Sequence, residues 1–131
     1  MELLLDTHTF LWYVTGDSQL SAQAKSDLDN RQNLRYVSLA SLWEMAIKYS
    51  IGKLELREPY ETLIPRLLQV NEFYVLNLSI AYLSEVAKLS FPDPNHKDPF
   101  DRLIVAQSKV EEIPVLSVDQ KLDAYGIHRR W

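Results

Sequence analysis

The sequence contains no cysteine among its 131 residues. This absence excludes a disulfide framework, a thiolate metal site and a cysteine nucleophile. Any bound metal must therefore be held by oxygen or imidazole ligands. Glycine is scarce, with three residues, while 47% of the residues are hydrophobic and 24% are charged. Because this composition is typical of a compact globular protein, we expect a single domain over residues 1–131.

Long hydrophobic runs are absent as well. No stretch approaches the roughly 20 apolar residues that are needed to span a bilayer. The N-terminus has neither the basic flank nor the cleavage pattern of a signal peptide. We therefore expect a cytoplasmic protein that makes no contact with a membrane.

The chain also lacks an excess of positive charge, because its formal net charge is −4. A protein that binds duplex nucleic acid by releasing bulk counterions normally has a basic excess, so this class is not favoured. An enzyme that binds phosphate groups through cations is compatible with the charge. Such an enzyme needs acids at its site and only a few basic residues around them.

Short apolar runs alternate with longer segments of helical pattern. The runs have the pattern of buried strands and lie at residues 1–5, 34–38, 73–78 and 113–118. The helical segments lie at residues 8–17, 22–33, 39–54, 58–73, 79–91, 98–112 and 119–126. Strands that are separated by helices predict an α/β fold with a mainly parallel central sheet.

The segment 39–54 gives the clearest helix. Its apolar residues form a stripe at helical spacing that we expect to face the core, and Gly52 is expected to end the helix. The stripe comprises Leu39, Leu42, Trp43, Ala46, Ile47 and Ile51. In the segment 58–73, Pro65 removes a backbone donor and is expected to divide or kink the helix.

Four acids should meet at one edge of this sheet. Parallel strands end on the same edge, where doubly wound sheets bind their ligands, and Asp6 and Asp119 each follow a strand. A helix that connects parallel strands runs antiparallel to them, so its first turn lies at that edge too. Asp101 opens one such helix, and Glu44 falls in the first turns of another. The fold class therefore brings the four carboxylates together.

Carboxylates that are packed together repel each other, and a bound cation relieves the repulsion. Ligation by oxygen atoms alone, with water left in the shell, suits Mg²⁺ or Mn²⁺, which usually keep room for phosphate oxygens. The pattern therefore indicates metal-assisted hydrolysis of phosphodiester bonds, with the four acids as metal ligands and catalytic residues.

Each acid also has a structural interpretation that the sequence leaves open. Asp6 can be a turn residue that bonds its own backbone. Glu44 fits a capping box with Ser41 and an i,i+4 ion pair with Lys48. Asp101 in a first helical turn can simply favour the helix dipole.

Several neighbouring residues are expected to support the site. Asp98, which precedes Pro99, has the signature of a helix N-cap and is a candidate for indirect support. Asp119 can cap the last helix, and Ser117 should share a face with it because the two are two residues apart.

Basic residues and histidines give weaker candidates. The candidates for a contact to phosphate are Lys48, Lys97, Arg102, Arg129 and Arg130. Arg102 is the best of them, because it is next to the third acid. His8 lies two residues after the first acid and is a candidate for a substrate contact. The three histidines are not spaced as a metal cluster, so His96 and His128 are assigned structural or solvent-exposed roles.

Four stretches together resemble the motifs of PIN-domain ribonucleases, specifically the bacterial VapC-type toxins of toxin–antitoxin pairs. The stretches are LLLDTH, SLWEMAIK, DPFDRLIVAQ and VLSVD. The resemblance implies a five-stranded parallel sheet flanked by helices. It also implies homodimers, an antitoxin encoded by a neighbouring gene, and Mg²⁺- or Mn²⁺-dependent cleavage of RNA. On this resemblance Asp6, Glu44, Asp101 and Asp119 are the four acids of the family's site.

Three alternatives remain at this stage. A phosphatase of the haloacid dehalogenase type needs a second aspartate two residues after the first, where this chain has His8. A phospho-acceptor receiver domain usually needs an adjacent acid pair after its first strand, where this chain supplies only Asp6. The third is a PIN-like binding module without catalytic activity, against which the intact set of acids argues.

Overall fold

The computed structural model describes all 131 residues and contains one five-stranded parallel sheet. Its strand order is β3-β2-β1-β4-β5. The strands are β1 (Glu2–Leu5), β2 (Leu34–Ser38), β3 (Tyr74–Leu76), β4 (Val115–Leu116) and β5 (Arg129–Arg130). The predicted α/β fold with a parallel five-stranded sheet is therefore confirmed.

Six α-helices and one 3-10 helix connect the strands. They are α1 (Thr7–Thr15), α2 (Ala22–Asp29), α3 (Leu39–Ser50), α4 (Tyr60–Val70), α5 (Ile80–Lys88), α6 (Pro99–Glu111) and η1 (Gln120–Tyr125). α1 ends at Gly16, which has a φ of 69° that favours glycine. Pro65 lies inside α4, which continues through it, so of the two expected outcomes, a division or a kink, the division does not occur. No helix is long and apolar enough to cross a membrane.

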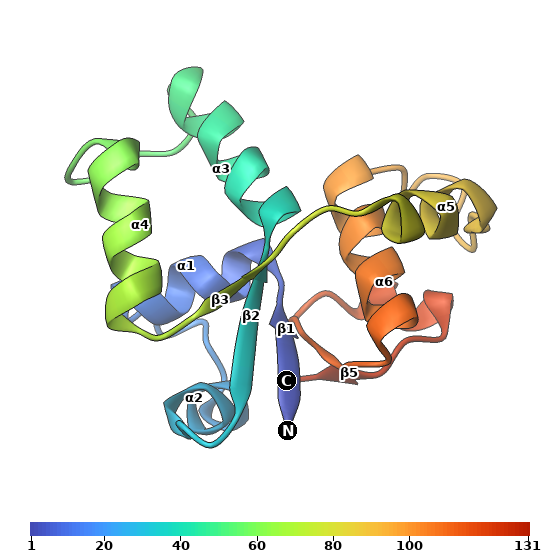
Figure 1. Cartoon of the computed structure of the whole chain (residues 1–131), viewed down its shortest axis with the longest axis horizontal. Coiled ribbons are helices and arrows are strands. Elements are labelled where there is room, and N and C mark those ends of the chain that lie inside the picture. The colour runs from blue at the N-terminus through green and yellow to red at the C-terminus, as the bar shows by residue number, and fades with distance from the viewer.

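The helices cover both faces of the sheet (Figure 1). Alternate residues of β1 point to opposite faces, so Leu3 and Leu5 pack with α1 to α4, while Leu4 packs with α6 and η1. All three leucines are fully buried. This double burial explains why β1 is a continuous apolar run.

The connections bring the ends of several elements to one edge of the sheet. In Figure 1 α6 runs antiparallel to β1, so its first turn lies where the strands end. α1 and α3 begin directly after β1 and β2, with Asp6 and Ser38 as their N-caps. The carboxyl ends of the central strands and the first turns of three helices therefore meet at this edge.

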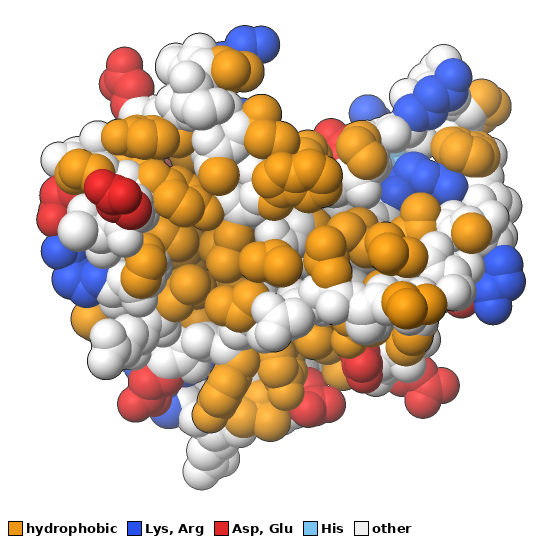
Figure 2. Space-filling view, turned by 45° about the horizontal axis from the view of Figure 1, so that its top comes forward, with side chains coloured by type: hydrophobic (Ala, Val, Ile, Leu, Met, Phe, Trp, Pro, Cys, Tyr) orange, Lys and Arg blue, Asp and Glu red, His pale blue; other side chains and the backbone are white.

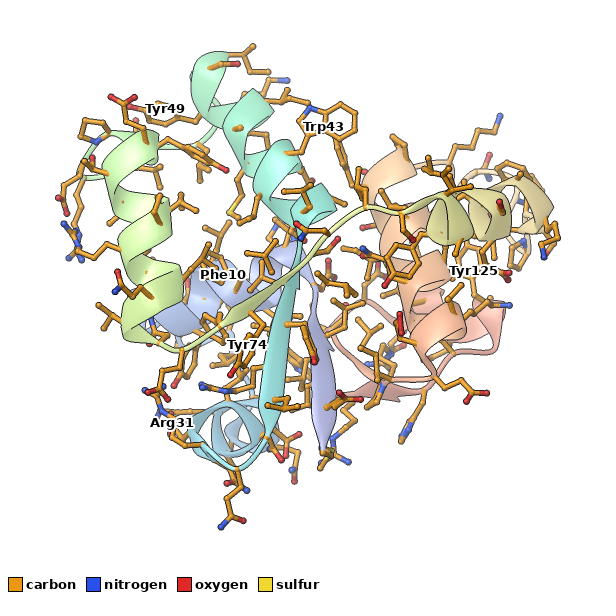
Figure 3. The ribbon with its side chains drawn as sticks, viewed as in Figure 1. Phe10, Arg31, Trp43, Tyr49, Tyr74 and Tyr125 are labelled. Carbon is orange, nitrogen blue, oxygen red and sulfur yellow. The ribbon has the colours of Figure 1, made fainter.

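The predicted inward direction of the apolar stripe on α3 is right for Leu42 and wrong for most of its other members. Leu42 faces the core together with Met45, whereas Trp43 is 56% exposed and Ile51 is 59% exposed. Periodicity identifies an apolar face but does not say which side of a helix meets the sheet. Figure 3 shows Trp43 projecting from α3, and its ring lies 5.2 Å from the ring of Phe100 at the start of α6.

Candidate active site

Asp6 is held rigidly at the end of β1. Its Oδ1 atom accepts a hydrogen bond of 2.7 Å from the backbone N–H of Thr7, and its Oδ2 atom accepts one of 2.7 Å from the Ser117 hydroxyl. The residue is only 8% exposed. Burial raises the pKa of Asp6 because water no longer stabilises the charge; the two hydrogen bonds oppose that rise, and the nearby Glu44 carboxylate adds to it.

Glu44 is fixed from two directions. Thr7 Oγ1 lies 2.8 Å from Glu44 Oε1 and also 2.8 Å from the Ser41 hydroxyl, and Lys48 Nζ donates to Glu44 Oε2 at 2.9 Å. The i,i+4 ion pair with Lys48 is therefore present. The predicted capping box of Ser41 and Glu44 is absent, because Ser38 caps α3 and Glu44 lies beyond the first turn.

Asp101 lies in the first turn of α6. Asp98 caps this helix and accepts hydrogen bonds from the N–H groups of Phe100 and Asp101, as its expected N-cap role requires. Burial raises the pKa of Asp101 to about 6; the hydrogen bond from His96 opposes the rise, while the carboxylates of Asp6 and Asp98 reinforce it.

Ser117 connects the first and fourth acids. Its hydroxyl is fully buried, donates to Asp6 Oδ2 and accepts the backbone N–H of Asp119 at 3.0 Å. Asp119 caps η1 by accepting the N–H of Lys121 at 3.0 Å. Ligand atoms of Asp119, Asp101 and His96 also lie within 4.8 Å of one another.

These contacts bring the four acids of the sequence to one edge. Asp6 joins Glu44 through Thr7 and joins Asp119 through Ser117, while its charge acts on Asp101. The set offers oxygen atoms, and two of its members, the buried Asp6 and the half-buried Asp101, have raised pKa values. A hard divalent cation fits such a set, because it would replace the lost hydration and cancel the repulsion.

Arg102 does not face the carboxylates. It is 5% exposed, its guanidinium lies 3.7 Å from the centre of the Phe91 ring, and it donates to the backbone carbonyls of Leu89 and Ser90. These contacts use the donors that a phosphate would need, so the proposed phosphate contact is corrected to a structural role. Adjacency to Asp101 misled the prediction, because successive residues of a helix point in different directions.

The histidines have different positions. His8 is exposed, and its ring lies 5.5 Å from that of Trp12. Burial raises the pKa of Asp6, and the interaction with His8 opposes this rise. His128 is also exposed. His96 is 8% exposed, and its Nε2 atom lies 3.0 Å from Asp101 Oδ2. No spacing pattern predicts this contact, because His96 lies in an irregular segment before α6.

Comparison with known proteins identifies the family. A model of the PIN domain matches residues 3–127. The chain belongs to the PIN domain family. The resemblance of its four sequence motifs is thereby confirmed, and the phosphatase and receiver interpretations are excluded. No curated protein matched the sequence.

Solved structures share this PIN fold across nearly the whole chain. A chain of the VapBC2 complex from Rickettsia felis, bound to a DNA fragment from its promoter, has a TM-score of 0.75 and 14% identity, covering 99% of this chain and 98% of that one. A chain of FitAcB from Neisseria gonorrhoeae has a TM-score of 0.67 and 18% identity, covering 97% and 95%. A chain of VapBC-1 from nontypeable Haemophilus influenzae has a TM-score of 0.68 and 14% identity, covering 99% of this chain and 97% of that one.

In metal-free protein, Asp101→Asn should stabilise the fold at neutral pH. Folding raises the pKa of Asp101 from 3.8 to about 6, so the stability that this group contributes is complete below pH 3.8 and is lost as the pH rises through about 6. Asparagine has no such dependence. With allowance for solvent screening, urea unfolding in EDTA should give the variant a free energy of unfolding about 1 to 2 kcal/mol above wild type near pH 7.5.

The difference in the free energy of unfolding between Asp101→Asn and wild type should shrink toward pH 4, where neither folded protein has a charge at position 101. A difference that stays constant between pH 4 and pH 8 would show that Asp101 has an ordinary pKa in the folded chain.

Proposed function

We propose that this PIN domain is a divalent-cation-dependent endoribonuclease and the toxin of a type II toxin–antitoxin pair. The observation that carries the proposal is the link from Asp6 through Ser117 to Asp119, with the charges of Asp6, Glu44 and Asp101 acting on each other. A buried carboxylate such as Asp6, which has hydrogen bonds but no cationic side chain as partner, is costly to the fold. A bound cation would offset that cost and would at the same time contact the phosphodiester substrate.

Asp6, Glu44, Asp101 and Asp119 would hold Mg²⁺ or Mn²⁺. When bound, such an ion polarises the scissile phosphate and makes a water molecule more acidic. The protein supplies the rigidity, because Asp6 is fixed by Thr7 and Ser117 at its two oxygens. We assign direct ligation to Asp6 and Asp101, whose pKa values burial raises.

Glu44 and Lys48 have a further role in this proposal. Both oxygens of Glu44 accept hydrogen bonds, from Thr7 and from Lys48. Glu44 therefore orients the site through Thr7 while it adds negative charge for the cation. The Lys48 side chain is 42% exposed and pairs with Glu44, and its ammonium group would contact a phosphate oxygen of the RNA.

Purified protein that has been freed of any bound partner should cleave RNA with Mg²⁺ or Mn²⁺ and stop when EDTA is added. Asp6→Asn and Asp101→Asn should each lower the cleavage rate by at least about 100-fold, because each removes a charged ligand. Gel analysis of a structured RNA measures the rate, and thermal melting checks folding. Asp123→Asn is the matched control, because Asp123 is exposed and pairs with Arg129. Undiminished cleavage by both site variants would show that the activity does not arise at these carboxylates and would remove the nuclease assignment.

The toxin role is supported by the structural neighbours, which include complexes named VapBC and a toxin–antitoxin complex from Klebsiella pneumoniae. A toxin that cleaves RNA would act in the cytoplasm. The partner would be an antitoxin protein that covers the site or its surroundings.

Expression of the wild-type chain should arrest bacterial growth, whereas Asp6→Asn at equal abundance should not, because the variant lacks a cation ligand. Co-expression of the protein encoded next to it should restore growth. Colony counts and immunoblots measure both effects. Normal growth of cells that contain abundant active enzyme would contradict the toxin role while leaving the nuclease activity intact.

We also propose a homodimer that uses the outward stripe of α3. The stripe contains Leu39, Trp43, Ile47 and Ile51, all of them at least 36% exposed. Figure 2 shows further hydrophobic side chains spread over the same side of the molecule. Contiguous exposed apolar surface of this kind is typical of protein–protein interfaces, and an exposed tryptophan is a common energetic centre.

Trp43→Glu should convert the dimer to a monomer, because it places a charge in an apolar contact. We expect the dimer dissociation constant to rise at least about 30-fold, which corresponds to about 2 kcal/mol. Size-exclusion chromatography with light scattering measures the mass. Val70→Glu is the control, because Val70 is 66% exposed at the end of α4 and lies outside the stripe. A wild-type monomer at high concentration would overturn this proposal.

A further inference from the structure

His96 has both ring nitrogens engaged at the edge of the proposed site. Its Nε2 atom lies 3.0 Å from Asp101 Oδ2, and its Nδ1 atom lies 2.9 Å from the hydroxyl oxygen of Tyr125. The His96 and Tyr125 rings are 5.6 Å apart, and both residues are buried. Figure 3 shows Tyr125 on the α6 side of the sheet. The imidazole therefore has a fixed position.

Arg102 determines the direction of the hydrogen bond at Tyr125. The Nη1 atom of Arg102 lies 3.3 Å from the Tyr125 hydroxyl, and its two terminal nitrogens donate to the carbonyls of Leu89 and Ser90. A guanidinium only donates hydrogen bonds, so the hydroxyl oxygen accepts from it. The hydroxyl hydrogen must then go to another acceptor.

The only acceptor that the structure gives this hydrogen is His96 Nδ1. A ring nitrogen that accepts a hydrogen bond carries a lone pair, so the ring hydrogen lies on Nε2. The Asp101 carboxylate only accepts, and Nε2–H donates to its Oδ2 atom. All groups are satisfied by one chain of donors that runs from Arg102 through Tyr125 and His96 to Asp101.

We propose that His96 is a positioning residue for Asp101 and is not itself a metal ligand. The inference rests on the proposed function of the site and deepens it. Ligand atoms of His96, Asp101 and Asp119 lie within 4.8 Å of one another, an arrangement that alone would also fit a mixed imidazole and carboxylate site. The chain of donors favours the positioning role over metal ligation. A metal-bound Nε2 would need a lone pair, whereas here Nε2 carries a hydrogen.

The alternative leaves a buried group unsatisfied. If Nε2 bound a cation, Nδ1 would carry the hydrogen and donate to the Tyr125 oxygen, which already accepts from Arg102. The tyrosine hydrogen would then have no acceptor, and an unsatisfied buried donor destabilises the fold. The chain of donors instead holds Asp101 Oδ2 and leaves Oδ1 for a cation.

This arrangement has a consequence for metal selectivity. An imidazole ligand favours Zn²⁺ and other transition metals, whereas oxygen ligands alone suit Mg²⁺ and Mn²⁺. By keeping the His96 lone pair turned toward Tyr125, the protein offers the cation only oxygen atoms. Tyr125 and Arg102 therefore contribute to the choice of metal although neither lies among the carboxylates.

The first test determines which ring nitrogen of His96 carries the hydrogen in metal-free protein. Long-range ¹H–¹⁵N spectra of histidine-labelled protein in EDTA, near pH 8 where an ordinary imidazole is neutral, identify the nitrogen that carries the hydrogen. His96 signals are assigned by their loss in His96→Gln. We expect hydrogen on Nε2, with no metal-bound signal after addition of Mg²⁺. Hydrogen on Nδ1, or a metal-bound Nε2, overturns the proposal whether or not the protein cleaves RNA.

The second test measures Mn²⁺ affinity by electron paramagnetic resonance. His96→Leu should weaken binding about 10- to 100-fold, because Asp101 loses the donor that orients it. His96→Gln should stay within about threefold of wild type, because its amide N–H replaces the Nε2–H donor. His128→Leu, at an exposed histidine, is the matched control.

Equal weakening by the leucine and glutamine variants would contradict a positioning role, as would unchanged binding by both. Thermal melts exclude unfolding, and if His96→Leu does not fold, the glutamine variant and the ring spectra still decide. Failure of the nuclease proposal would appear differently, as absence of RNA cleavage by wild-type protein whose ring spectra and Mn²⁺ binding are as expected.

Discussion

The hydrogen bond from the Ser117 hydroxyl to Asp6 is the contact on which the candidate site depends. It joins two buried residues that are 111 positions apart in the chain, at a distance of 2.7 Å. The parallel pairing of Leu5 with Leu116 produces it, because this register places the residues after β1 and β4 next to each other. A shift of one residue would turn the side chains to opposite faces.

Burial of this edge has an electrostatic cost. Asp6 and Asp101 both have raised pKa values, with burial as the largest cause. Packing around β1 supplies the compensating stability, since its leucines are fully buried on both faces of the sheet. Rigid elements thus hold carboxylates in a geometry that they would not adopt alone, which is the usual physical character of an active site.

Several elements were predictable because their signals are local. The apolar runs of β1 and β4 and the Asp98–Pro99 cap of α6 follow from burial on two faces and from helix-end chemistry. β5 was not predictable, because Arg129–Arg130 gives no apolar pattern. Ion pairs of these arginines with Asp123 and Asp27, the latter 103 residues away, support this strand. Such long-range partners leave no trace in local sequence.

The sequence by itself determined that acids follow the strands and open the helices, and hence that Asp6, Glu44, Asp101 and Asp119 belong to one edge. Only the tertiary structure decided which other neighbours act on them: His96 contacts Asp101, whereas Arg102 turns away to backbone carbonyls. The physical reason is direction. Periodicity and chain order locate a residue along an element, but the side toward which its side chain points depends on packing against segments far away in the chain.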